Sequence, residues 1–374
     1  MSAAATRRLA DSIPKCMKAM QTVYGPFAQL SPAQASSWIP PPMAEGHRGR
    51  YLWTDAFGVL NLITLGTLAH NPTYTTLAAR LIARVHDVLG RTRDGTRRLP
   101  GATDAHPLRG GLRIGKASDE DDPSGDGDGQ YYHYLTLWMF ALNRMSLAAR
   151  DPRYNALAVE LAQAVHPRFV RDRDAERPRM CWKMSVDLSR PVVRSEGNLD
   201  PIDGYVVYGL LQRTNKADPS VLAQEVREYK KIVDTKWRQS LSDDPLDLGM
   251  TLWTAHWLEG EEEWATQLTN RAAICTRVLF EDGYYDQSRA YRLAFREFGT
   301  GLGMRCHTET RQKELSDEEQ EDWEAYSEKI LSTWEPDIER GSTHTPASLV
   351  PITLVMYSSA VIPGAFHRDF FEQH

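Results

Sequence analysis

A glycine-rich acidic loop that leads into an apolar run is the first candidate for chemistry. Residues 126–133 read DGDGQYYH, and the apolar run continues beyond them. Asp128 stands just before this run, where a carboxylate could act as a general acid or base on a bound substrate. It could equally cap the helix that follows, a common role for aspartate. A calcium loop is a poorer interpretation, because the spaced glutamate of an EF-hand is missing.

A second candidate segment begins at Glu196 and ends at Asp203, with three acids within eight positions. One acid can be explained as structure, because Asn198 or Asp200 can cap a helix whose first position is proline. That explanation does not cover all three. Two carboxylic acids, one protonated and one ionised, can act together as general acid and general base beside a bond that breaks. We predict Asp128 and Glu196 as this catalytic pair, supported by Asp203.

The third candidate is a charge inside an apolar run, Asp55 within residues 51–69. Burying a carboxylate costs free energy unless the group is paired. Asp55 should therefore face either a polar pocket or a basic partner such as Arg50. We include it among the catalytic candidates and keep the structural ion pair as the alternative.

Aromatic and histidine side chains could line a saccharide site, because sugar rings stack on aromatic faces, although such residues on apolar helices are more often core. The predicted substrate contacts are Trp53, Tyr132, His133, Trp182, Trp253, His256 and His344. A sugar epimerase needs bases that remove a proton beside a carbonyl, and His256 with His307 or His344 could supply them. The pair Gly110-Gly111 between Arg109 and Arg113 is a candidate anion-binding loop.

Composition argues against several other classes of protein. The chain has 374 residues, a net charge of −6 and 41% hydrophobic residues. This mild acidity does not favour binding to nucleic acid or to an anionic membrane, which are negatively charged. No apolar stretch is long enough to span a bilayer. The four cysteines have neither CxxC nor zinc-ligand spacing. We therefore expect a cytoplasmic enzyme that uses no metal or other cofactor and acts on a small molecule, while the oligomeric state does not follow from the sequence.

Helix-period patterns fill the chain, and strand signals are nearly absent. Some helices are apolar on all sides, which is typical of helices buried on both faces; we predict them at 51–69, 130–149, 200–214, 246–259, 289–304 and 346–361. Others are amphipathic; we predict them at 5–23, 72–89, 152–168, 219–238, 261–280 and 316–333. The two kinds alternate, which predicts six inner and six outer helices in a single domain over residues 1–374.

An internal repeat and the loop lengths indicate where a site should lie. Residues 71–86 and 151–166 share an Asn/Asp-Pro start, an apolar ladder and a closing histidine. Connections from inner to outer helices are short, whereas those from outer to inner helices are long, at 24–50, 90–129 and 169–199. Long loops in a compact domain are usually functional. We expect them to gather where the inner helices begin, so that Asp55, Asp128 and Glu196 would converge there.

Twelve helices in alternating inner and outer order resemble the six-hairpin glycosidase-like (α/α)6 barrels over nearly the whole chain. That superfamily contains glycoside hydrolases, unsaturated uronyl hydrolases, sugar 2-epimerases and lyases. The resemblance implies an all-α (α/α)6 barrel and a carbohydrate-active enzyme, with glycoside hydrolysis as the main expectation and sugar 2-epimerisation or isomerisation as the alternative. A third alternative is a helical toroid that cyclises, isomerises or binds a small apolar molecule, although the DxDD motif of toroidal terpene cyclases is absent.

Overall fold

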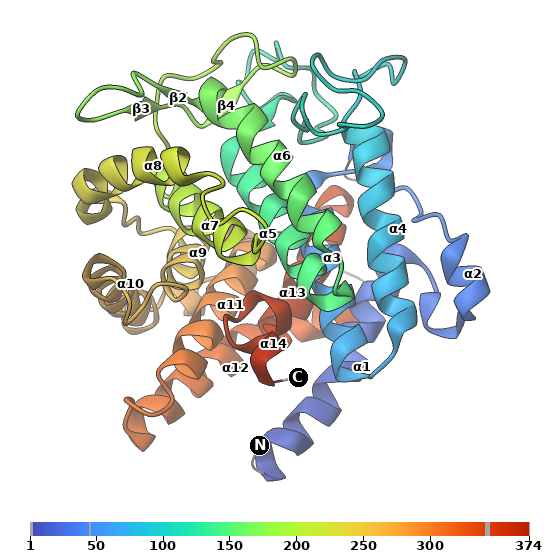
Figure 1. Ribbon diagram of the computed structural model, residues 1–374. Helices are drawn as coiled ribbons and strands as arrows, with labels where there is room; N and C mark the ends of the chain where they lie inside the picture. The colour runs from blue at the N-terminus through green and yellow to red at the C-terminus, as the bar shows by residue number, and fades with distance from the viewer. Residues whose placement is uncertain (1–2, 45, 341–344, 374) are drawn as a thin grey trace. The chain divides into compact units, whose positions relative to one another are not determined.

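The computed structural model describes residues 3–44, 46–340 and 345–373 (Figure 1). Its contacts group the chain into two compact units. The middle unit is Leu30–Ser240, and the terminal unit combines Met1–Gln29 with Leu241–His374. The single domain expected over residues 1–374 stays a prediction. Among the helices of the described ranges, none has the length and apolarity needed to cross a bilayer.

Three helical hairpins build the middle unit. Each pairs a buried helix with a more exposed one: α3 (Leu52–Leu68) with α4 (Pro72–Leu89), α5 (Tyr132–Ala149) with α6 (Pro152–Phe169), and α7 (Asp200–Thr214) with α8 (Ala223–Lys236). The buried helices pack against one another in the order α3, α5, α7, and the short α2 (Pro32–Ser36) packs on α4. The predicted alternation of inner and outer helices is therefore confirmed within this unit.

The hairpins form for the reasons that the sequence pattern indicates. Nearly every side chain of α3 and α5 is buried, whereas α4 buries one face and exposes the other. The two copies of the repeat begin alike: Asn71 accepts a hydrogen bond from the Thr73 amide, and Asp151 accepts one from the Arg153 amide, each at 3.0 Å. A proline follows each cap, where its missing N–H costs nothing.

The long loops of the middle unit meet at the end where its buried helices begin. Figure 1 shows loop 90–129 and the segment that carries β2, β3 and β4 at the same end of α4 and α6. Two short antiparallel pairs organise them: β1 (Gln130–Tyr131) with β4 (Lys183–Met184), and β2 (Val170–Arg171) with β3 (Arg179–Met180). The predicted gathering is thus confirmed for the loops 90–129 and 169–199, and these strands are short enough to leave the fold all-α.

Three further helix pairs build the terminal unit, two of them hairpins and the third made of helices from the two ends of the chain. They pair α9 (Pro245–Ala255) with α10 (Glu263–Glu281), α11 (Ala294–Thr310) with α12 (Asp317–Arg340), and α13 (Val350–Val361) with the N-terminal α1 (Ala3–Tyr24). The short α14 (Phe370–Gln373) follows. The alternating order predicts the N-terminal helix as an outer helix beside the one at 316–333. Helix α1 packs chiefly on α13 and reaches α12 through an ion pair between Lys15 and Glu335, 2.7 Å long.

Some boundaries differ from the prediction because polar contacts override the apolar pattern. The helix expected at 289–304 begins at Ala294, since the preceding residues form 3-10 turns at Tyr284–Asp286 and Arg289–Tyr291. Arg292 then makes two buried hydrogen bonds of 2.6 Å with the carboxylate of Glu297, so this arginine faces inward before the helix starts.

The closing histidines of the repeat are core residues of the outer helices. His86 on α4 is buried and accepts a hydrogen bond of 3.1 Å from the Trp138 indole on α5. His166 on α6 is fully buried and lies 2.8 Å from the Glu228 carboxylate on α8. Burial lowers the pKa of both, that of His86 to about 3.

His86 should make the stability of the protein depend on pH. Its pKa is lower in the folded chain than in the unfolded chain, so the unfolded chain binds more protons below about pH 6.5 and stability falls as the pH drops. The difference amounts to about 2 kcal/mol at pH 5. We expect His86→Gln, which keeps an acceptor for Trp138, to lose less stability than the wild type between pH 7.5 and pH 5 in urea denaturation. Equal losses of stability in the wild type and the variant would contradict a lowered pKa of His86 in the folded chain.

Candidate functional site

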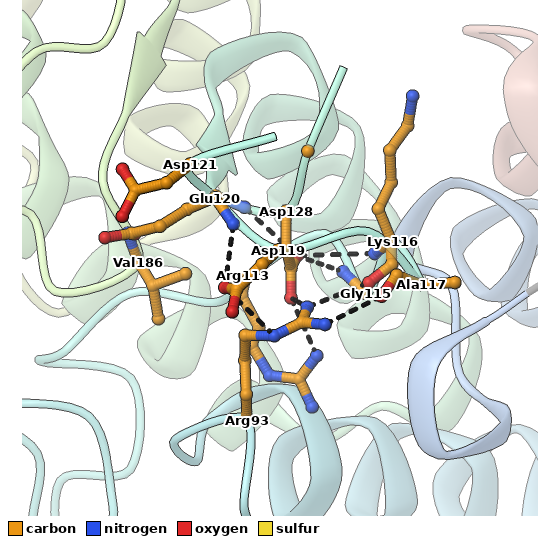
Figure 2. A network of polar contacts seen from close by, with 12 residues as sticks. Arg93, Arg113, Gly115, Lys116, Ala117, Asp119, Glu120, Asp121, Asp128 and Val186 are labelled. Atoms are coloured by element: carbon orange, nitrogen blue, oxygen red, sulfur yellow. Dashed lines mark hydrogen bonds and ion pairs between the residues drawn. The ribbon is translucent and has the colours of Figure 1, made fainter. Parts of the chain in front are cut away.

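Asp128 is the centre of a buried network in the loop layer of the middle unit (Figure 2). One carboxylate oxygen accepts from Arg93 at 2.6 Å and from Arg113 at 3.0 Å. The other accepts from the amides of Gly115 at 2.9 Å, Gly129 at 3.0 Å and Lys116 at 3.3 Å. An ionised carboxylate offers about four acceptor sites, so five donors saturate it.

These contacts indicate that Asp128 holds the surrounding loop segments together. The carboxylate and the Arg113 side chain are both fully buried. Burial lowers the pKa of Arg113, and the neighbouring Asp128 opposes this change only in part. Arg93 also donates to the carbonyls of Lys116 at 2.9 Å and Ala117 at 2.8 Å, which fixes the turn around the carboxylate. No acceptor site remains for a substrate proton, and Asp128 does not lie on the pocket that Glu196 lines.

The candidate anion-binding loop at Gly110-Gly111 is filled by a side chain of the protein. Gln130 accepts from the Leu112 amide at 2.9 Å and donates to the carbonyls of Gly110 at 2.9 Å and Val186 at 2.8 Å. A Cβ at Gly111, whose φ is +74°, would lie 1.9 Å from the Gln130 side-chain oxygen. The loop therefore encloses a glutamine, and Arg113 is committed to Asp128.

Asp55 is fully buried in the first turn of α3 and forms an ion pair of 3.3 Å with Arg50. Arg50 also donates to the carbonyls of Gly49 and Pro41. This is the structural ion pair that the sequence left open as the alternative.

A set of aromatic side chains surrounds His133 at the start of α5. We call the aromatic cluster His133 together with the four rings whose centroids lie 5.0–6.1 Å from it: Trp53, Tyr131, Tyr134 and Trp182. The His133 side chain is 33% exposed, and its Nδ1 lies 3.2 Å from the carboxylate of the nearly buried Asp200. A carboxylate that orients an accessible imidazole is an arrangement suited to proton transfer.

An open pocket of about 520 Å³ lies on the neighbouring loop. We call it the basic pocket, and its lining is Arg179, Arg194, Ser195, Glu196, Gly197, Asn198 and Lys236. Glu196 is the one predicted catalytic acid that lines it. Its carboxylate lies 3.5 Å from the Lys236 ammonium and 3.7 Å from the Arg177 guanidinium. Lys236, at the end of α8, also donates to the carbonyl of Gly197.

Two links join the aromatic cluster to the basic pocket. The indole of Trp182 donates to the hydroxyl of Ser195 at 2.8 Å, and the Trp182 amide donates to the Ser195 carbonyl at 3.2 Å. On the other side, a Cβ at Gly197 would lie 2.0 Å from the Asp200 carboxylate. Gly197, with φ +71°, therefore lets the pocket loop pass close to the acid that orients His133. The two form one candidate site.

The remaining candidates lie elsewhere. Tyr132 is fully buried in the core against Phe169 and Tyr229, and Asp203 is nearly buried in the first turn of α7. In the terminal unit, Trp253 is buried and donates to the Phe366 carbonyl at 3.2 Å.

The alternative histidine bases lie in the terminal unit. His256 is buried just after α9; its Nδ1 contacts the Trp253 carbonyl, and its Nε2 accepts from the Arg368 amide at 3.2 Å. His307 is buried in the last turn of α11, and burial lowers its pKa to about 4. Both stand at the opposite helix end from the predicted mouth, and His344 lies outside the described residues.

Several site residues were not predicted from the sequence. Tyr131 and Tyr134 flank His133 in the chain, so a run of ring residues at a helix start was an available signal. Asp200 was considered only as a cap, although it lies beside His133. Arg179 and Lys236 belong to β3 and to the end of α8, and no local pattern marks them.

Removing the Asp128 carboxylate should destabilise the middle unit. Asp128→Ala leaves the buried guanidinium of Arg113 without its ion pair, a change that costs about 3–5 kcal/mol. The comparison is Asp121→Asn, where an 81% exposed acid loses a surface pair with Arg190 worth less than about 1 kcal/mol. Urea denaturation measures both. A loss below about 1 kcal/mol for Asp128→Ala would show that the network is not structural.

Comparison with known proteins supports the architecture. No family model and no curated protein matches the chain. An α-1,6-mannanase of glycoside hydrolase family 76 from Salegentibacter sp. is 10% identical, with 94% of this chain and 98% of that chain covered and a TM-score of 0.58. Cellobiose 2-epimerase from Spirochaeta thermophila is 10% identical, with 94% of this chain and 98% of that chain covered and a TM-score of 0.51. D-mannose isomerase is also 10% identical, with 94% of this chain and 96% of that chain covered and a TM-score of 0.52. The chain therefore shares the fold of these enzymes, an (α/α)6 barrel.

Proposed function

We propose that the chain is a carbohydrate-active enzyme that hydrolyses a glycosidic bond at the aromatic cluster and basic pocket. The observation that carries the proposal is the junction between the two. Trp182 belongs to the ring surface and holds Ser195 of the pocket, so a sugar lying on the rings reaches the loop that bears Glu196. Aromatic faces with a few converging polar groups are what a saccharide site requires.

We assign the reactive roles by accessibility. Glu196 lines the pocket and is held in two ion pairs, so it serves as the ionised carboxylate that activates water or attacks the sugar. His133, oriented by Asp200, serves as the proton donor in place of a second carboxylic acid. Asp128 and Asp55 position the loops and α3, and Asp203 supports the start of α7.

The proposed reaction balances with these groups alone. The bond between the anomeric carbon and the leaving oxygen breaks while His133 gives its proton to that oxygen. Water supplies the hydroxyl group to the anomeric carbon, and its remaining proton goes to Glu196. Proton transfer then returns both side chains to their starting states. The protonation of the leaving group and the activation of water each contribute about 10²–10⁴ in rate.

A sugar 2-epimerase or isomerase is the second candidate, and the pair of His133 and Asp200 favours it. An imidazole that a buried carboxylate orients is suited to take a proton from the carbon beside a carbonyl. Two solved structures with this fold are a cellobiose 2-epimerase and a D-mannose isomerase. In this alternative His133 replaces His256 and His307 as the base, since both of those are buried.

One assay in deuterated water separates the two candidates. Hydrolysis of a glycoside creates new reducing ends without deuterium on carbon, whereas epimerisation or isomerisation introduces solvent deuterium beside the carbonyl and leaves the number of reducing ends unchanged. We expect new reducing ends when oligosaccharides, including α-1,6-linked mannans, are screened. Carbon-bound deuterium alone would replace hydrolysis by epimerisation. The absence of turnover on every saccharide would favour the toroidal binding protein or cyclase.

Variants of the two reactive groups test the roles. We expect Glu196→Gln and His133→Gln each to lower kcat/KM by about 10²–10⁴, because each removes a proton acceptor or donor. Asp234→Asn, on the same α8 helix as Lys236 but in an exposed pair with Lys230, is the control and should keep full activity. Melting curves check that each variant is folded. Full activity in both Glu196→Gln and His133→Gln would remove this site from the mechanism.

A further inference from the structure

We propose that the basic pocket binds an anionic group of the saccharide, and that the substrate is a sugar phosphate ester. This inference rests on the proposed function, because it adds the class of sugar to the same site. The pocket offers three cationic side chains to a space of about 520 Å³, and only one of its lining residues is acidic.

Two of these cations have no counterion in the protein. Across residues 3–44, 46–340 and 345–373, neither the Arg179 nor the Arg194 guanidinium forms a hydrogen bond or an ion pair, and both side chains are exposed at the pocket. Other arginines of the same loop layer are paired, such as Arg93 with Asp128 and Arg190 with Asp121. Unpaired guanidiniums at a concave surface are the usual means of recognising phosphate or carboxylate oxygens.

The remaining charges of the pocket balance one another. Glu196 is the only acidic residue of the lining. Its carboxylate forms ion pairs with the Lys236 ammonium at 3.5 Å and the Arg177 guanidinium at 3.7 Å. These two cations more than offset its charge. Arg179 and Arg194 therefore leave an excess of at least two positive charges. A phosphate monoester carries about −1.5 to −2 at neutral pH, whereas a carboxylate carries −1, so the balance favours the phosphate ester.

The pocket also offers a neutral donor at its junction with the aromatic cluster. The Ser195 hydroxyl oxygen accepts from the Trp182 indole, so its own proton is directed to another acceptor. Ser195 is exposed at the pocket, where a phosphate or sugar oxygen could accept that proton. The geometry places the phosphate on Arg179 and Arg194 and the sugar ring toward Trp182.

Binding of inorganic phosphate, measured by isothermal titration calorimetry, tests the pocket without any turnover. We expect Arg179→Gln and Arg194→Gln each to raise the Kd about tenfold and the double variant about a hundredfold, as for the loss of one and two charge-assisted contacts. Arg190→Gln is the matched control: a half-exposed arginine of the same loop layer that does not line the pocket. Its Kd should stay within twofold of the wild type. A double variant that also binds within twofold of the wild type would overturn the inference.

The type of anion and the dependence on the proposed function are resolved by two comparisons. Mannose 6-phosphate should bind more tightly than mannose and than glucuronate, and this preference should vanish in the double variant; tighter binding of glucuronate would overturn the choice of a phosphate ester. Glu196→Gln should keep phosphate binding while it lowers kcat/KM by about 10²–10⁴. Intact phosphate binding in a chain that turns over no saccharide refutes the proposed function alone, whereas turnover without any effect of Arg179 and Arg194 on KM refutes the anionic substrate alone.

Discussion

The buried carboxylate of Asp128 is the interaction on which the loop layer of the middle unit depends. It ties Arg93, Arg113 and the turn at Gly115 to the chain two residues before β1. From there β1 pairs with β4, and the residue before β4 is Trp182, whose amide and indole both hold Ser195. A fully buried charge thus helps to determine where the loop that lines the basic pocket lies.

The acids of this unit share a residue type but differ in their surroundings. Asp55 and Asp128 are fully buried against arginines, which makes them costly to remove and unable to exchange protons with a ligand. Asp200 is nearly buried but touches a partly exposed imidazole, and Glu196 lies on an open pocket. In the proposed site, burial therefore distinguishes the residues that position loops from those assigned a reactive role more clearly than charge does. By the same criterion, the proposed histidine is the partly exposed His133 and not the buried His256 or His307.

The sequence was sufficient to predict the helices because their signals are local. The caps at Asn71 and Asp151 and the apolar ladders that follow lie within single turns of the chain. The roles of Asp128 and Glu196 could not be told apart in this way, since each is an acid before an apolar run. The two acids differ in the residues that contact them. Arg93 and Arg113 bind Asp128, whereas Lys236 binds Glu196, and these partners lie between 15 and 40 residues away in the sequence. Such contacts depend on how the loops cross, which periodicity does not encode.

The two-residue pairing of β1 with β4 has a consequence for the order of folding. The hairpins of the middle unit join neighbouring segments and lose little chain entropy on closing, whereas the loop layer joins segments that are far apart in the sequence and loses more. The layer should therefore form after the helices and open before them, in a local unfolding event that leaves the hairpins intact. A saccharide that binds only the closed layer would shift that equilibrium, so the ligand would complete the structure that receives it.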